Sequence, residues 1–175
     1  MALLEKARKT EFLGRDFLMW LWFRSETGDG KFTVAEEDSF EIWFDSMVIL
    51  QSESEERKEI IRCSGENSLL KEARFALAGN KKITQAMIKL IIEENEWSFV
   101  LDSSWLDFRT LKTPKVIQDN REDPEGLFYE KIYLVEQAVA AVNSVFESYM
   151  MERLSPEWKS HTLPALNGWI NEGRK

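Results

Sequence analysis

The sequence predicts an α+β fold: an antiparallel sheet of about five strands, an aromatic amino-terminal helix, one short helix, a long carboxyl-terminal helix and a terminal helix. Three observations predict it. Hydrophobic residues make up 43% of the 175 residues, enough for one sizeable core. Apolar and polar residues alternate in the middle of the chain, as in half-buried strands, whereas both ends show helical spacing. We therefore predict a single domain over residues 1–175.

The first predicted helix spans residues 11–26 and carries apolar side chains almost all the way round its axis, among them Phe17, Trp20 and Trp22. Such a helix must be covered on several sides. It is expected to lie at the centre of the core or to form half of an interface. Gly28 and Gly30 follow and are typical of a helix end.

The middle of the chain predicts the sheet. Residues 40–44 and 47–50 read as a hairpin that turns at Asp45 and Ser46, and residues 59–63 as a third strand. Ser68 caps a short helix over residues 69–78. Residues 83–93 fit both a helix and a strand, and we predict a strand paired with residues 97–101. Residues 105–111 would extend the sheet.

Residues 112–126 read as a surface loop that leads into the longest helix, residues 127–153. Apolar residues recur along that helix in alternating steps of four and three. They suggest either a seam for another subunit or the side that packs on the sheet. Ser155 and Pro156 open a terminal helix, in which Pro164 is expected to cause a kink. The stepped residues are Phe128, Ile132, Val135, Val139, Val142, Phe146 and Tyr149.

The net charge of −8 and the pI near 4.9 oppose attraction to phosphate backbones for the molecule as a whole. A single cysteine, Cys63, excludes an intrachain disulfide, and with one histidine, His161, soft metal ligands are too few for a zinc site. No secretory signal or membrane span is apparent. We expect a cytoplasmic protein.

No catalytic constellation is apparent, so we expect a non-enzymatic protein without cofactor or metal. His161 is interpreted as a surface or capping residue, and Cys63 as a packing residue. The acidic groups at 36–38 and 93–96 could in principle hold Mg²⁺. We interpret them as solvated loop charges, with a metal-dependent nuclease as the enzymatic alternative.

Positive charge is concentrated in one segment of this acidic chain. Within nineteen residues the only acid is Glu72, which leaves a local charge of +4. If these residues share a face, they can contact a nucleic-acid backbone, with Arg109, Lys112 and Lys115 extending the patch. A plain solvated face is the alternative. The candidate nucleic-acid-binding residues are Lys71, Arg74, Lys81, Lys82 and Lys89.

Three stretches together resemble the recombination-associated RdgC family, particularly its shorter, divergent bacterial members. They are EFLGRDFLMWLWFRSE, GNKKITQAMIKLIIEENEWSFVLDSSWLDFRTLKTPK and IYLVEQAVAAVNSVFESYMMERLSPEW. The resemblance concerns mainly the carboxyl-terminal portion of the family. It implies sequence-independent binding of double-stranded DNA that modulates recombination, usually by a ring-shaped homodimer that restrains a RecA-type recombinase.

Two functions therefore stand side by side. One is an RdgC-like DNA-associated protein, with a homodimer as a further expectation. The other is an acidic protein-binding adaptor, or an accessory subunit of a larger bacterial defence or regulatory complex, because aromatic anchors favour protein interfaces. The candidate interface residues are Phe17, Trp20, Trp22, Val135, Val139, Val142 and Phe146.

Overall fold

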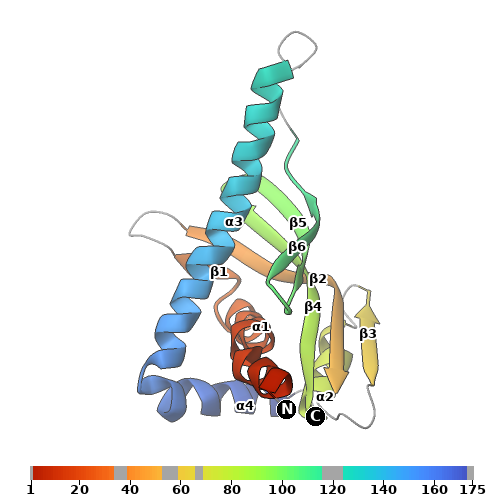
Figure 1. Ribbon diagram of the computed structural model, residues 1–175, viewed down its shortest axis with the longest axis vertical. Coiled ribbons are helices and arrows are strands. Elements are labelled where there is room, and N and C mark those ends of the chain that lie inside the picture. Colours follow the sequence, from red (N-terminus) through yellow and green to blue (C-terminus); the bar gives the residue numbers. More distant parts are fainter. Residues whose placement is uncertain (1, 34–38, 53–58, 66–68, 116–123, 173–175) are drawn as a thin grey trace.

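The computed structural model describes residues 2–33, 39–52, 59–65, 69–115 and 124–172, and it has the predicted α+β fold, a sheet with helices packed against it (Figure 1). The helices are α1 (Ala2–Thr27), α2 (Leu69–Ala78), α3 (Pro124–Leu154), the π-helical turn η1 (Trp158–Thr162) and α4 (Leu163–Glu172). The strands are β1 (Lys31–Thr33), β2 (Ser39–Ser52), β3 (Ile60–Ser64), β4 (Lys81–Ile92), β5 (Asn95–Asp102) and β6 (Asp107–Lys112).

The sheet is antiparallel and has six strands in the order β1-β2-β4-β5-β6, while β3 pairs with the later part of β2. Strand β4 settles the ambiguity of residues 83–93 in favour of a strand. Its partner β5 lies in the predicted place, and β6 extends the sheet as predicted. The short strand β1 lies in a polar stretch for which we predicted no strand.

The predicted hairpin over residues 40–50 is wrong, because β2 runs through this region as one strand. Phe44 pairs with Ile88 and Val48 with Ala86, so β2 advances four residues while β4 advances two. A bulge absorbs the two extra residues, and both Asp45 and Ser46 stay exposed in it. The two polar residues therefore mark a bulge and not a tight turn. In the bulge their side chains reach water although the strand continues.

Helix α1 lies at the centre of the core, which was one of the two alternatives predicted from its apolar residues. It contacts β2, β4, α3 and α4, and so it is covered from several directions (Figure 1). After α1 the backbone turns at Gly30, whose φ is +71°. A Cβ at Gly30 would lie 2.4 Å from the ring of Trp43, so this position needs glycine for space as well as for conformation.

Helix α3 is attached to the sheet where Trp97 of β5 donates a hydrogen bond from Nε1 to the carbonyl oxygen of Leu134 (2.8 Å). Pro164, where we expected a kink, is the second residue of α4, and α4 follows directly on the π-helical turn η1. The helical hydrogen-bonding pattern therefore changes just before the proline, which has no N–H to donate. Ser68 and most of the predicted loop lie outside the described residues.

Candidate interaction surfaces

The five predicted nucleic-acid-binding cations do not form a free basic patch. Arg74 is held inside the fold: its Nη2 donates to the carbonyl oxygen of Trp169 (2.5 Å), and its guanidinium lies 4.8 Å from the centre of that indole ring. Its Nη1 lies 3.6 Å from Oε2 of Glu26. Arg74 therefore joins α2 to α1 and α4, and a phosphate could not engage it without breaking these contacts.

Three lysines of the predicted patch are paired with carboxylates of other segments. Lys81 lies 3.2 Å from Glu59, Lys82 3.2 Å from Asp16, and Lys89 2.7 Å from Glu96. Lys71 is exposed and makes no ion pair among the described residues. The local charge of +4 counted along the chain is thus largely neutralised in space by Glu26, Glu59, Asp16 and Glu96.

A smaller basic group lies on the side of the sheet away from the core. Lys89, Ser98 and Lys112 are opposite one another on β4, β5 and β6, so their side chains share a face. This brings together one predicted cation and one of its predicted extensions. Lys112 and Lys115 are exposed and have no ion pair among the residues that the structure describes.

Arg109 adds little free charge to this group, because its Nη2 lies 2.9 Å from Oδ2 of Asp102. Burial raises the pKa of Asp102, but hydrogen bonds from Ser104 and Gln85 and the charge of Arg109 outweigh it. The pKa of Asp102 therefore lies below its usual value, and its carboxylate remains charged beside Arg109. Phosphate binding at this face would have to rely mainly on the lysines.

The α1 residues nominated for an interface are core residues instead. Phe17 and Trp22 are completely buried, and Trp20 is 3% exposed. Phe17 packs against Phe146 and Tyr149, and Trp22 against Phe44 and Trp169. The aromatic composition of α1 indicated burial correctly, but the chain itself provides the cover, so these side chains are not available to a partner.

The nominated α3 residues divide into two groups. Val142 is 3% exposed and Phe146 packs against the core, so these two are not interface residues. Val135 and Val139 are 39% and 36% exposed, so their side chains are accessible to a partner. Between residues 134 and 145 a different line of α3 side chains packs inward. This line was not predicted from the sequence, because two of its members are alanines, whose hydrophobic signal is weak. It consists of Leu134, Ala138, Ala141 and Val145.

The amino-terminal half of α3 presents large apolar side chains to solvent. This half, residues 124–139, begins beyond the end of the sheet (Figure 1), and we call it the α3 arm. Phe128 is 61% exposed and Ile132 38%. Together with Val135 and Val139 they form a line that we call the apolar stripe. Tyr129 and Tyr133 are 67% and 59% exposed. They lie on a third side of the helix, away from both the apolar stripe and the buried line.

The sequence contained a signal for the arm that was not used. Phe128 and Ile132 belong to the predicted stripe, but only its later members were nominated for an interface. Tyr129 and Tyr133 stand outside the stripe, and a helix that is apolar on several sides must be covered by something. The second half of α3 is covered by other parts of this chain, whereas Tyr129 and Tyr133 of the arm remain 67% and 59% exposed.

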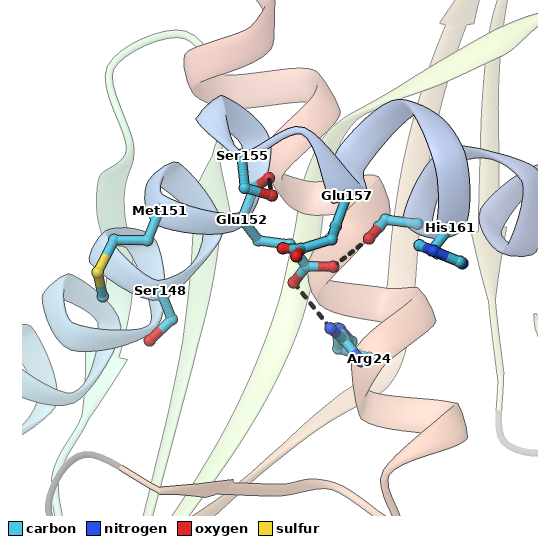
Figure 2. A pocket seen from close by; sticks show the side chains of 8 residues that line it. Arg24, Ser148, Met151, Glu152, Ser155, Glu157 and His161 are labelled. Carbon is cyan, nitrogen blue, oxygen red and sulfur yellow. Dashed lines mark hydrogen bonds and ion pairs between the residues drawn. The ribbon is translucent and has the colours of Figure 1, made fainter.

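A shallow hollow of about 630 Å³ lies where α1, α3 and η1 meet (Figure 2). Its centre is Glu152, which accepts hydrogen bonds from Arg24 Nη2 (2.8 Å), Trp20 Nε1 (3.1 Å) and the hydroxyl of Thr162 (2.5 Å). Burial raises the pKa of Glu152, but the hydrogen bonds from these donors and the charge of Arg24 lower it by a larger amount. The pKa of Glu152 therefore lies below its usual value. Glu152 thereby connects three helical segments.

The hollow shows no catalytic geometry. His161 lies on its rim, is exposed and makes no hydrogen bond within the described part of the chain. The hydroxyl of Ser155 donates to the backbone carbonyl of Glu152 (2.8 Å), so it is not paired with a base. The hydroxyl of Ser148 also donates to a backbone carbonyl of α3, whereas the contacts of Arg24 and Thr162 with Glu152 join different helical segments.

The described residues also form neither of the other two candidate sites, a metal site and a reactive cysteine. No group of three or more His, Cys, Asp or Glu side chains there could hold a metal ion. The acidic residues at 36–38 lie outside those residues. Cys63 is buried, and burial, followed by the charge of Glu72, raises the pKa of its thiol. A thiol in that state is a poor nucleophile.

Comparison with known proteins adds no identification: the chain matches no protein-family model and no curated protein sequence. The resemblance to the RdgC family therefore remains an interpretation of the sequence. Among the described helices, none combines the length and the apolar character needed to cross a bilayer.

Proposed function

We propose that this protein is a non-enzymatic binding subunit that contacts another protein chain through the α3 arm. One observation carries the proposal: six large apolar side chains within twelve residues of one helix are 36–67% exposed. Single exposed apolar residues are normal on a protein surface, but a contiguous apolar region is typical of an interaction site. Aromatic residues are also the commonest anchors of protein interfaces.

The gain available from covering the arm is large enough to matter. Aromatic side chains bury about 200 Å² each, so Phe128, Tyr129 and Tyr133 leave roughly 370 Å² of their surface exposed. At about 25 cal/mol per Å² this corresponds to a gross gain of roughly 9 kcal/mol. Association itself costs on the order of 4–15 kcal/mol. The gain exceeds this cost only where the cost lies in the lower half of its range, so we expect a partner that covers the arm to bind with modest net affinity.

The proposal is tested by site-specific photo-cross-linking in the native host. We replace Ile132 of the arm with a benzophenone amino acid and, as a matched control, Lys159, which is exposed on η1. Illumination should give a covalent adduct with a protein from position 132 and little from position 159. Adducts of equal yield at both positions, or none at 132, would refute the proposal.

A second candidate function is contact with double-stranded DNA, which the family resemblance implies. The observation that favours it is the row Lys89, Ser98 and Lys112 on the sheet face away from the core, with Lys115 just beyond it. The ion pair of Lys89 is partly exposed, and such pairs contribute only about 0–1 kcal/mol, so a phosphate can compete for this lysine. The net charge of −8 opposes the binding.

Fluorescence anisotropy with a random-sequence duplex tests this second candidate. Binding should weaken steeply as salt rises, because counterions are released on binding. Replacing Lys112 and Lys115 with glutamine should weaken it further, while Lys71→Gln, an exposed lysine on α2, serves as the control. Absence of binding at low salt, or equal effects of the three substitutions, would rule out DNA contact at this face.

A further inference from the structure

Strand β6 has an unusual backbone conformation at Thr110. Five non-glycine residues of the described chain have a positive φ, and four of them lie between elements, at helix ends or in turns. Thr110, with a φ of +52°, is the only one of the five within a strand. A positive φ strains any residue with a Cβ, and β-branched residues such as threonine tolerate it least. The conformation of Thr110 therefore costs stability and calls for a physical reason.

The strain belongs to a bulge between β5 and β6. Strand β5 advances two residues between Val100 and Ser98. Over the same stretch β6 advances three residues, from Arg109 to Lys112. One residue of β6 is therefore extra, and Thr110 lies in that interval. Some bulges contain a residue in the left-handed conformation, which is usually glycine. Here it is an exposed threonine.

The packing of β6 does not require the extra residue. Phe108 and Leu111 pack against the core, whereas Arg109 and Lys112 are exposed. Without Thr110 these four side chains would alternate inward and outward, as in a regular strand. A strand that is one residue shorter would thus keep the same residues on the same faces. The reason for the bulge must therefore lie outside the core.

The position of β6 in the sheet supplies a reason. It is the last strand of the order β1-β2-β4-β5-β6, and among the described strands it pairs with β5 alone. The outward N–H and C=O groups of an edge strand can accept a further strand. At the other end of the order, β1 is only three residues long, whereas β6 has six residues, the length of an ordinary strand. An edge of that length needs protection.

Side-chain charge does not protect this edge against a second copy of the chain. If β6 were regular, antiparallel pairing about Arg109 would set Asp107 opposite Lys112 of the other copy, and such opposite charges attract. The two Arg109 side chains would face each other, but each is already paired with Asp102 of its own chain (2.9 Å from Nη2 to Oδ2). A feature of the backbone is therefore needed to prevent self-pairing.

We infer that the bulge at Thr110 guards this edge of the sheet against pairing with another strand. A bulge bends the strand, increases its twist and takes its outward N–H and C=O groups out of line. An incoming strand then cannot form a continuous ladder with β6. The guard is independent of the α3 arm, which belongs to another element, so this inference and the proposed function can fail separately.

Deletion of Thr110 tests the inference. The deletion variant should fold, with a Tm about 2–6 °C above that of the wild type, because the strained residue is gone and the core residues keep their faces. It should also self-associate through the regular edge. Sedimentation velocity over a range of protein concentrations should give an association constant at least about tenfold above that of the wild type, since one or two further ladder hydrogen bonds suffice for such a gain.

Hydrogen exchange shows where the association occurs. In the deletion variant the backbone amides of β6 should exchange more slowly as the protein concentration rises, and those of the wild type should not. The matched control is Thr110→Gly, which relieves the strain but keeps the extra residue and therefore the bulge. Its Tm should not fall below that of the wild type, and its self-association should remain at the wild-type level.

Four results would overturn the inference. A deletion variant that unfolds at a lower temperature than the wild type would show that the fold itself needs the bulge. Association no stronger than that of the wild type would show that the edge needs no guard, and association without slower exchange in β6 would place the contact elsewhere. Equal association of Thr110→Gly and the deletion variant would show that the extra residue is not the guard. In every case Ile132 is unchanged, so photo-cross-linking at that position still tests the α3 arm.

Discussion

Glu152 offers the sharpest test of how the helices are held together. Replacing it with alanine removes the acceptor for Trp20 Nε1 and for the Thr162 hydroxyl, and breaks the pair with Arg24. Trp20 and Thr162 are 3% and 9% exposed, and a buried donor without a partner costs about 1–3 kcal/mol. Arg24 is 46% exposed, so its pair adds only about 0–1 kcal/mol. We expect a loss of about 3 kcal/mol.

The loss should depend on pH in a defined direction. The pKa of Glu152 is lowered in the folded protein, so its ionised form is the one that folding stabilises. This contribution is complete above the unfolded pKa, about 4.5, and is lost as the pH falls through the lower folded value. The difference in stability between wild type and Glu152→Ala should therefore shrink in acid.

Thermal unfolding followed by circular dichroism measures both effects. A loss of about 3 kcal/mol corresponds to a fall in Tm of roughly 6–12 °C for a chain of this length. The matched control is Glu147→Ala, an exposed carboxylate on the same helix. The reasoning fails if the two variants unfold at the same temperature at pH 7, or if their difference is unchanged between pH 7 and pH 3.

Two further substitutions test the packing of α1 and α3. A Cβ at Gly14 would lie 1.8 Å from the carbonyl oxygen of Ser103, so Gly14→Ala must push α1 off the sheet; we expect a loss of at least about 3 kcal/mol in urea unfolding. Gly168→Ala meets nothing within 4 Å and should be neutral or stabilising, and equal effects would contradict the close approach. Trp97→Phe removes the hydrogen bond to Leu134 and should cost about 1–3 kcal/mol, against no measurable cost for Trp105→Phe, whose side chain is 85% exposed. A cost for Trp97→Phe no greater than for Trp105→Phe would show that this bond does not anchor α3.

The sequence was informative where local pattern decides the structure. Alternating apolar residues identified β4 and β5, and the burial of Phe17 and its neighbours followed from an apolar residue set that surrounds the helix axis. Pattern failed at residues 45–46, where two polar residues signal a turn and a bulge equally well. Only the pairing of β2 with β4 distinguishes them, and that pairing involves residues about forty positions away.

The candidate site depended on contacts that no local pattern reveals. The positive charge of residues 71–89 was counted along the chain, but Lys82 is paired with Asp16, and Arg74 with Glu26 and the carbonyl of Trp169. The stripe of α3 was recognised, yet its division into a covered and an exposed half depends on how far the sheet and α1 extend beside the helix. Ala138 and Ala141 give little hydrophobic signal although both are buried.

The central claim, that the α3 arm is where this protein meets its partner, can be tested most directly by ¹⁹F NMR. The chain has three tyrosines, of which Tyr129 and Tyr133 are exposed on the arm and Tyr149 is completely buried. Protein labelled with fluorotyrosine should give two resonances that shift or broaden in concentrated host extract, while that of Tyr149 stays in place. Arm resonances that do not change in the extract would contradict the claim.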